Sequence, residues 1–167
     1  MIRKALKPDA EALATLINSA YRGDSSRAGW TTEADMVSGD RINAEGVLSL
    51  MQEKDSFFLL YLDEQDELLG CVHLHQENPE TLYFGMLAVE PKSQAKGVGR
   101  QLLQAIEAES IKLKCQQLRL TVIEIRDELI AYYERNGFRL TGAEYPFPYP
   151  ANLKIPGLKL LEMIKPL

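Results

Sequence analysis

Cysteine is scarce in this sequence. The two cysteines that occur, Cys71 and Cys115, are far apart and form no Cys-x-x-Cys pair. A disulfide framework and a cysteine-based zinc cluster are therefore not indicated, and we predict no metal site. Both cysteines are expected to serve as small apolar core residues in a reducing compartment.

Long apolar runs are missing as well. No segment approaches the roughly 20 apolar residues that cross a bilayer. The N-terminal stretch MIRKALKPDAEALATL has no apolar region followed by a small-residue cleavage site, so no secretory leader is predicted. We expect no membrane partner and a cytoplasmic location.

An excess of positive charge is also absent. The chain has 19 basic and 24 acidic residues, which give a net charge of −5 and a pI near 5.2. This balance argues against a nucleic-acid-binding surface spread over the molecule, although it leaves room for a local anion site. Hydrophobic residues make up 46% of the 167 residues, enough for a packed core, and no linker divides the chain. A single domain over residues 1–167 is predicted.

Hydrophobic periodicity predicts a mixture of strands and helices. The expected elements are a strand at 2–5, a helix opened by Pro8, a loop over 21–30, a short or broken helix capped by Thr31 or Thr32, a hairpin from 56 with its turn at 63–66, a strand at 82–89, a helix around 102–111, a strand at 118–123, a helix from about 127 to Gly137, and strands at 138–141 and 158–164. The three strands between 56 and 89 are predicted to form an antiparallel meander. Residues 142–157 are expected to form an ordered loop.

The most informative segment is VEPKSQAKGVGRQLL, which places two glycines between an apolar strand and an amphipathic helix. Backbone N–H groups in such a loop, together with the helix N-terminus, can bind phosphate oxygens. Gly97 and Gly99 allow the backbone to approach an anion closely. Lys92, Lys96 and Arg100 add positive charge. The segment therefore indicates a local anion site in an otherwise acidic chain.

The usual nucleotide-binding patterns do not fit this loop. A P-loop needs Lys and then Ser or Thr after its second glycine, but Arg100 and Gln101 follow Gly99. A dinucleotide-binding fingerprint needs a small residue where Leu102 stands. An anion site of another kind remains, and so does a simple glycine-containing turn with solvated lysines.

Two motifs in register resemble the GNAT superfamily of N-acetyltransferases. LAVEPKSQAKGVGRQLL resembles its acetyl-CoA signature, in which a Gln or Arg precedes Gly-x-Gly or Gly-x-Ala at the start of a helix. Further along, LRLTVIEIRDELIAYYERNGF resembles a later motif that ends in Tyr-x-x-x-Gly-Phe. The order of elements matches too. The resemblance implies an α/β (α+β) fold with a mixed, mostly antiparallel sheet of about seven strands flanked by about four helices.

The same resemblance implies where acetyl-CoA binds. Its pantetheine arm would lie between the fourth and fifth strands, and the loop amides would hold the pyrophosphate. The implied cofactor-binding residues are Leu87, Ala88, Val89, Gln94, Ala95, Lys96, Gly97, Val98, Gly99, Arg100 and Tyr133. Ala95 departs from the Gly or Asn often seen at its position, and Arg126 stands where the family often has Asn.

Acyl transfer to an amine needs an uncharged nitrogen, a stabilised oxyanion and a proton for the departing thiolate. Tyr133 matches the family tyrosine near the CoA sulfur, and a phenol with a pKa near ~10 suits a proton donor. Many relatives carry a catalytic Glu on the fourth strand, but LYFGMLAV has no carboxylate. Glu33 is the candidate base; a solvated or helix-capping role is the alternative.

Candidate acceptor-binding residues come from the variable segments. They are Trp30, Arg41, His75 and Tyr145. An acidic surface with aromatic residues would suit a cationic amine, whereas Arg41 could select a substrate carboxylate, and the sequence leaves both open. For His75 a structural role is the alternative.

We therefore expect an acetyl-CoA-dependent N-acetyltransferase that acts on a primary amine of a small molecule by direct attack in a ternary complex. The alternatives are a non-catalytic acyl-CoA-binding sensor on the same fold and an enzyme that acetylates a protein lysine or N-terminus. Acetyl-CoA and the amine are the expected partners. No nucleic-acid partner is expected, and a homodimer remains open.

Overall fold

The computed structural model of the chain describes residues 1–22, 26, 32–94 and 96–167. The strands are β1 (Ile2–Lys4), β2 (Ser56–Leu62), β3 (Leu68–Asn78), β4 (Thr81–Val89), β5 (Gln117–Ile123), β6 (Arg139–Pro146) and β7 (Lys159–Pro166). The α-helices are α1 (Ala10–Tyr21), α2 (Ala44–Gln52), α3 (Val98–Lys112) and α4 (Asp127–Arg135). Short 3₁₀ turns lie at Lys7–Asp9, Pro91–Ser93 and Pro150–Asn152. None of the helices in the described part is long and apolar enough to cross a membrane.

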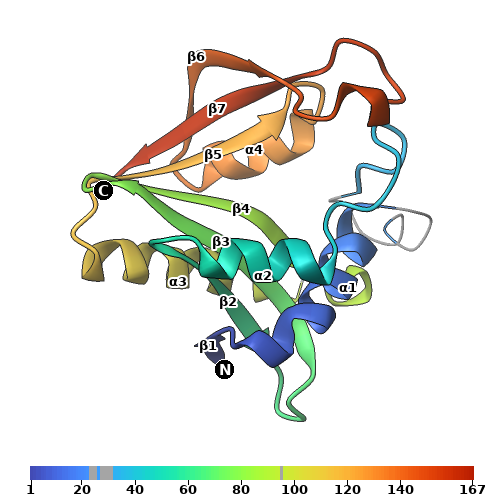
Figure 1. The fold of residues 1–167 in the computed structure, drawn as a ribbon. Helices are drawn as coiled ribbons and strands as arrows, with labels where there is room; N and C mark the ends of the chain where they lie inside the picture. The colour runs from blue at the N-terminus through green and yellow to red at the C-terminus, as the bar shows by residue number, and fades with distance from the viewer. Residues whose placement is uncertain (23–25, 27–31, 95) are drawn as a thin grey trace.

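The seven strands form one sheet in the order β1-β2-β3-β4-β5-β7-β6, and only the β4–β5 pair is parallel (Figure 1). This confirms the predicted mixed, mostly antiparallel sheet with four α-helices. The β2–β3 hairpin turns where expected, because the Asp63 carboxylate accepts hydrogen bonds from the N–H groups of Gln65 and Glu67.

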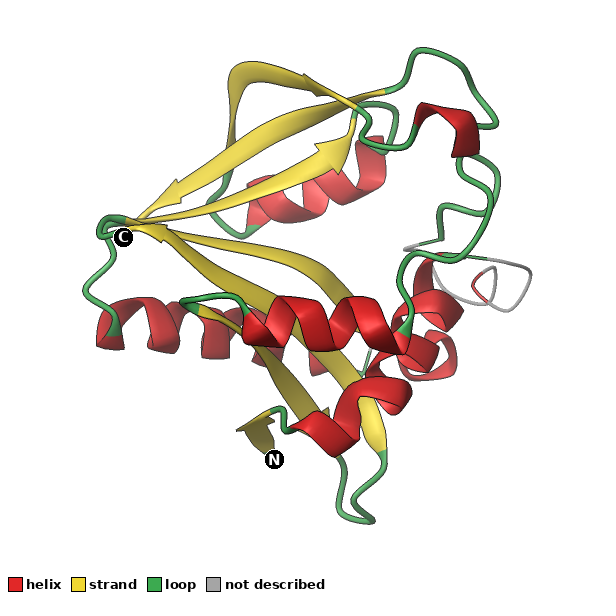
Figure 2. Ribbon diagram, in the orientation of Figure 1, coloured by secondary structure: helices red, strands yellow, loops and turns green. Residues whose placement is uncertain are grey.

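Helices cover both faces of the sheet (Figure 2). On one face, α1 and α2 bury Leu13, Ile17 and Val47 against Phe58 and Leu60 of β2. On the other face, α3 and α4 pack on a second apolar cluster that includes Leu74 of β3. Since successive residues of a strand point to opposite faces, β3 is apolar on both sides. The two predicted core cysteines are buried, one in each cluster.

Two predicted boundaries are wrong. The second helix does not begin at Thr32, which caps only a turn by accepting a hydrogen bond from Ala34 N–H; Thr31 lies outside the described residues. The helix begins at Ala44, where the Asn43 side chain caps it by accepting from Gly46 N–H. Strand β6 extends to Pro146, because pairing with β7 continues through the residues that we had expected to form a loop.

The sheet forks between β4 and β5. These strands pair only from Thr81 to Tyr83, and beyond that β4 follows β3 while β5 stays paired with β7 (Figure 1). The divergence coincides with a register shift between β3 and β4, next to Met86, whose φ of 49° is unusual for a non-glycine residue. The fork leaves strand edges without β partners on both sides, which is where the site lies.

Candidate active site

The fork contains two adjoining clefts. The first, of about 320 Å³, is lined by the end of β4, the loop before α3 and one side of α4; we call it the glycine-loop cleft. The second, of about 270 Å³, lies on the opposite side and is lined by Arg22, Arg41, Arg126 and residues of β4, β5 and the segment before β7; we call it the arginine cleft. The two clefts share four wall residues, Tyr21, Leu87, Leu129 and Tyr133.

The glycine-loop cleft has the form of an anion site. Gly97 caps α3 with a left-handed φ of 84°, a conformation that a side chain would strain. A Cβ added at Gly99 would meet only the Tyr132 hydroxyl at 3.7 Å and a Val89 methyl at 3.9 Å, so this glycine faces open space. The first-turn N–H groups of the 15-residue α3 have no partners within the helix, and Arg100 adds a positive charge. The loop can therefore bind phosphate oxygens.

Backbone groups of β4 face this cleft. The carbonyl of Val89 accepts a hydrogen bond from the Gln94 side chain at 3.1 Å, which folds the loop back onto the strand. The carbonyl of Leu87 accepts one from the hydroxyl of Tyr21. Ala88 lies between them with its side chain buried on the α1 face. Of the predicted cofactor-binding residues, the structure brings Leu87, Val89, Gln94, Gly97, Gly99, Arg100 and Tyr133 to one cleft.

Tyr133 stands where the two clefts meet. Its ring packs edge-on against Phe84 and Phe138, at centroid distances of 6.1 and 5.5 Å, and the residue is buried. Burial raises the pKa of the Tyr133 hydroxyl well above its usual value, with the neighbouring Tyr21 adding to the effect. The phenol therefore stays protonated at neutral pH, as a proton donor must.

Tyr21 is a site residue that our sequence reasoning missed. It ends α1, lines both clefts and bonds the Leu87 carbonyl, and burial raises its pKa. The sequence did contain a signal. Tyr21 continues the four-residue spacing of Leu13 and Ile17 on the buried face of α1, which predicts that its hydroxyl points toward the interior.

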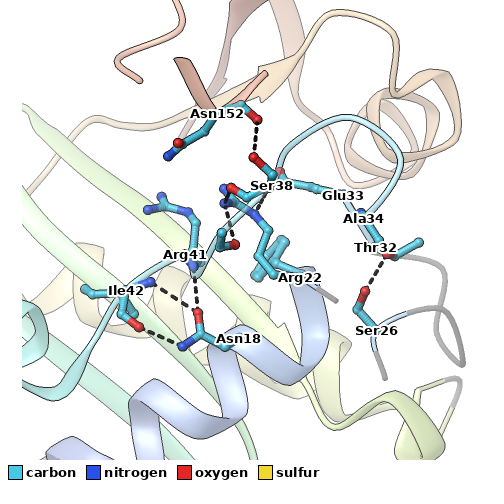
Figure 3. A network of polar contacts seen from close by, with 12 residues as sticks. Asn18, Arg22, Ser26, Thr32, Glu33, Ala34, Ser38, Arg41, Ile42 and Asn152 are labelled. Carbon is cyan, nitrogen blue, oxygen red and sulfur yellow. Dashed lines mark hydrogen bonds and ion pairs between the residues drawn. The ribbon is translucent and has the colours of Figure 1, made fainter. Parts of the chain in front are cut away.

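The floor of the arginine cleft is an ion-pair cluster. Glu33 accepts from Arg22 Nε at 3.2 Å and from Arg126 Nη1 at 3.5 Å, and the three side chains are only 5 to 12% exposed. Arg22 also donates to the carbonyls of Ser38 and Gly39 (Figure 3). Burial lowers the pKa of Arg22, although Glu33 opposes the shift. The predicted base Glu33 thus lies in the cleft, with each carboxylate oxygen next to a guanidinium.

Arg41 is held at the side of the same cleft. The Asn18 side chain of α1 accepts from the backbone N–H of Arg41 at 2.7 Å and of Ile42 at 3.2 Å, and it donates to the Ile42 carbonyl (Figure 3). The backbone is therefore fixed on both sides of the Arg41 Cα. Its guanidinium makes no hydrogen bond or ion pair with any other residue that the structure describes.

Two distant segments meet over the arginine cleft. Ser38 donates to the carbonyl of Asn152 through its N–H at 2.7 Å and its hydroxyl at 3.1 Å. Val37 forms a β-bridge with Leu153, and the Lys154 ammonium donates to the Ala34 carbonyl at 2.6 Å. These contacts join the segment after α1 to the segment before β7, and Val37 and Asn152 from these two segments both line the arginine cleft.

The structure does not bring every predicted acceptor residue to this cleft. His75 lies on β3 opposite Ser56 of β2 and lines neither cleft, because β4 stands between β3 and the fork. Tyr145 donates to Glu162 from β6 and also lines neither cleft; Phe147 and Tyr149, which follow it, line the arginine cleft. Trp30, like the cofactor candidate Ala95, lies outside the described residues.

No group of three or more His, Cys, Asp or Glu side chains that could hold a metal ion occurs in the described part of the chain. The site is built from phenols, guanidiniums, one ion-paired carboxylate and backbone amides. Such a set suits proton transfer and anion binding.

Comparison with solved structures finds the same fold in several proteins, acetyltransferases among them. The protein smu.2055 from Streptococcus mutans UA159 has a TM-score of 0.76 at 21% identity, with 99% of this chain and 98% of that chain covered. A ribosomal-protein-alanine N-acetyltransferase from Brucella melitensis has a TM-score of 0.72 at 20% identity, covering 100% and 99%. A GNAT family acetyltransferase from Elizabethkingia anophelis with acetyl-CoA bound has a TM-score of 0.61 at 20% identity, covering 77% and 93%.

One of two sequence comparisons identifies the family. A search among curated proteins finds no significant match. The model of the acetyltransferase (GNAT) family, in contrast, matches residues 11–138, which include the whole lining of the glycine-loop cleft. With its fork, its glycine loop and this match over most of its length, the chain belongs to the acetyltransferase (GNAT) family.

Proposed function

We propose that the chain transfers the acetyl group of acetyl-CoA to a primary amine of a small molecule, by direct attack in a ternary complex. The observation that carries the proposal is the position of Tyr133 in the wall between the glycine-loop cleft and the arginine cleft. A thioester bound along the first cleft would present its carbonyl where an amine in the second cleft can reach it.

The glycine-loop cleft fits acetyl-CoA. Its α3 N-terminus and Arg100 supply N–H donors and positive charge for the pyrophosphate, and its walls are mainly apolar. The acetyl-CoA-bound relative from Elizabethkingia anophelis shares this fold. The backbone of Leu87 and Val89, on the open edge of β4, would lie beside the pantetheine arm.

The reaction needs two proton transfers. The amine nitrogen bonds to the thioester carbonyl carbon, the carbon–sulfur bond breaks, and the products are an acetamide and CoA thiol. Tyr133 would donate its phenolic proton to the departing thiolate, and Glu33 would accept the proton that the nitrogen loses. Solvent would then restore both groups. The neighbouring guanidiniums favour an amine in its uncharged, nucleophilic form.

The size of the arginine cleft supports a small acceptor. Its volume is about 270 Å³, close to that of the smaller pockets that hold small-molecule ligands.

The test separates catalysis from simple binding. Purified protein is assayed for CoA thiol release from acetyl-CoA with a panel of small primary amines and with peptides bearing a free N-terminus. We expect amine-dependent release with the small amines. A rise in Tm with acetyl-CoA but no amine-dependent release would instead support the acyl-CoA sensor, and release with peptides alone would support the protein-modifying enzyme.

A further inference from the structure

The arginine cleft carries a positive group that no acid in the described residues neutralises. Five charged residues line it: Arg22, Glu33, Asp40, Arg41 and Arg126. Glu33 is engaged by two of the arginines, and Asp40 is exposed. The cleft is therefore cationic in a protein whose net charge is −5.

Arg41 is the residue that this imbalance singles out. Its guanidinium is half-buried and lines the cleft, but within the described part of the chain it has no hydrogen-bond or ion-pair partner. Figure 3 shows the Arg41 side chain extending away from Asn18 and toward Asn152. The Asn18 side chain accepts hydrogen bonds from the backbone on both sides of the Arg41 Cα. Because the backbone of Arg41 is fixed and its side chain lines the cavity, the guanidinium can reach a ligand there without any rearrangement of the chain.

The chemistry of the group defines its ligand. A guanidinium binds planar oxyanions in a bidentate fashion, and a carboxylate is the simplest of them. The only carboxylate within the cleft floor, that of Glu33, already contacts Arg22 and Arg126. A polyamine, by contrast, would add positive charge next to three arginines.

We propose that the acetyl acceptor is a small amine that also carries a carboxylate, of amino-acid size, and that Arg41 binds this carboxylate. This inference rests on the proposed acetyltransferase function and names the substrate class for the same site. The acceptor amine then points toward Tyr133 while its carboxylate lies at the Arg41 side of the cleft. Phe147 and Tyr149 line the remaining wall and can pack against an apolar side chain.

The first experiment compares matched acceptors with the wild-type protein. Initial rates of CoA release are measured for L-phenylalanine with L-phenylalaninamide, for L-leucine with L-leucinamide, and for putrescine. The amine of each carboxamide is less basic than that of the acid, so reactivity alone favours the carboxamide at neutral pH. A kcat/KM at least about tenfold higher for the acids supports the proposal, since that ratio corresponds to one hydrogen-bonded charge pair.

The second experiment uses Arg41→Gln with Arg139→Gln as a matched control, since Arg139 is exposed on β6 and lines neither cleft. Arg41→Gln should raise KM for the acids by about tenfold to a hundredfold and change kcat/KM for the carboxamides by less than about threefold. The increase in Tm that N-acetyl-L-phenylalanine produces in the presence of CoA should disappear in Arg41→Gln and persist in Arg139→Gln.

The outcomes separate this inference from the proposed function. If carboxamides or putrescine react as well as the acids or better, the inference that the acceptor carries a carboxylate is wrong, but the proposed acetyltransferase function is supported. The role of Arg41 is also overturned if a folded Arg41→Gln variant loses kcat/KM equally for the acids and for the carboxamides. If no amine supports CoA release, the proposed function is wrong, and so is the substrate class that rests on it.

Discussion

Removal of a single oxygen tests the role of Tyr133. Tyr133→Phe keeps the ring that packs against Phe84 and Phe138, and the hydroxyl makes no hydrogen bond to another described residue, so the free energy of unfolding should change by less than about 1.5 kcal/mol. The proton donor is lost, however. General acid catalysis contributes about 100-fold to 10,000-fold, so the rate of acetyl transfer should fall by that factor. This corresponds to about 3 to 5 kcal/mol of transition-state stabilisation.

The assay measures single-turnover acetyl transfer, because slow product release could hide a change in the chemical step. Tyr145→Phe is the control, because it removes the same oxygen from a tyrosine that lines neither cleft; the Tyr145 hydroxyl donates to Glu162. The increase in Tm produced by acetyl-CoA should be the same in Tyr133→Phe as in the wild type. A single-turnover rate for Tyr133→Phe equal to that of Tyr145→Phe would remove Tyr133 from the mechanism.

Three other changes give distinct results. Gly99→Val fills the open space beside Tyr132 and Val89 and should weaken acetyl-CoA binding measured by calorimetry; an unchanged Kd would mean that the cofactor lies elsewhere. Glu33→Gln should lower kcat by about 100-fold, whereas an unchanged kcat would leave Glu33 only as a partner of Arg22 and Arg126. Burial lowers the pKa of His73 to about 4, so the folded protein favours the neutral imidazole. The free energy of unfolding should therefore fall by about 3 kcal/mol as the pH drops from 7 to 4. Denaturant titrations of His73→Gln should show a smaller fall.

The candidate cofactor-binding residues that lie together in the structure belong to local motifs. Gly97, Gly99 and Arg100 lie at one helix start, so the strand, loop and helix pattern was enough to predict that they share one loop. Tyr133 came from the resemblance to the motif that ends in Tyr-x-x-x-Gly-Phe, and Gly137 of that motif has the left-handed φ of 92° expected after a helix.

The acceptor side could not be predicted in the same way. Arg126 and Glu33 are 93 residues apart in sequence, and Ser38 and Asn152 are 114 apart, so no local pattern joins them. Period-two alternation places His73 and His75 on the same face of β3, but it does not predict whether either side chain reaches the site. The length of β6 depended on β7, its partner strand, which comes later in the chain and pairs with Tyr145.

The contacts across the arginine cleft have a consequence for how this protein can change over evolutionary time. The lining of the glycine-loop cleft lies wholly within residues 11–138, the part that the family model describes. Phe147, Tyr149, Asn152 and Leu160, which complete the arginine cleft, lie beyond it. Substitutions in this last stretch can reshape the arginine cleft without touching the loop before α3. The glycine-loop cleft can thus be inherited unchanged while the lining of the arginine cleft diverges.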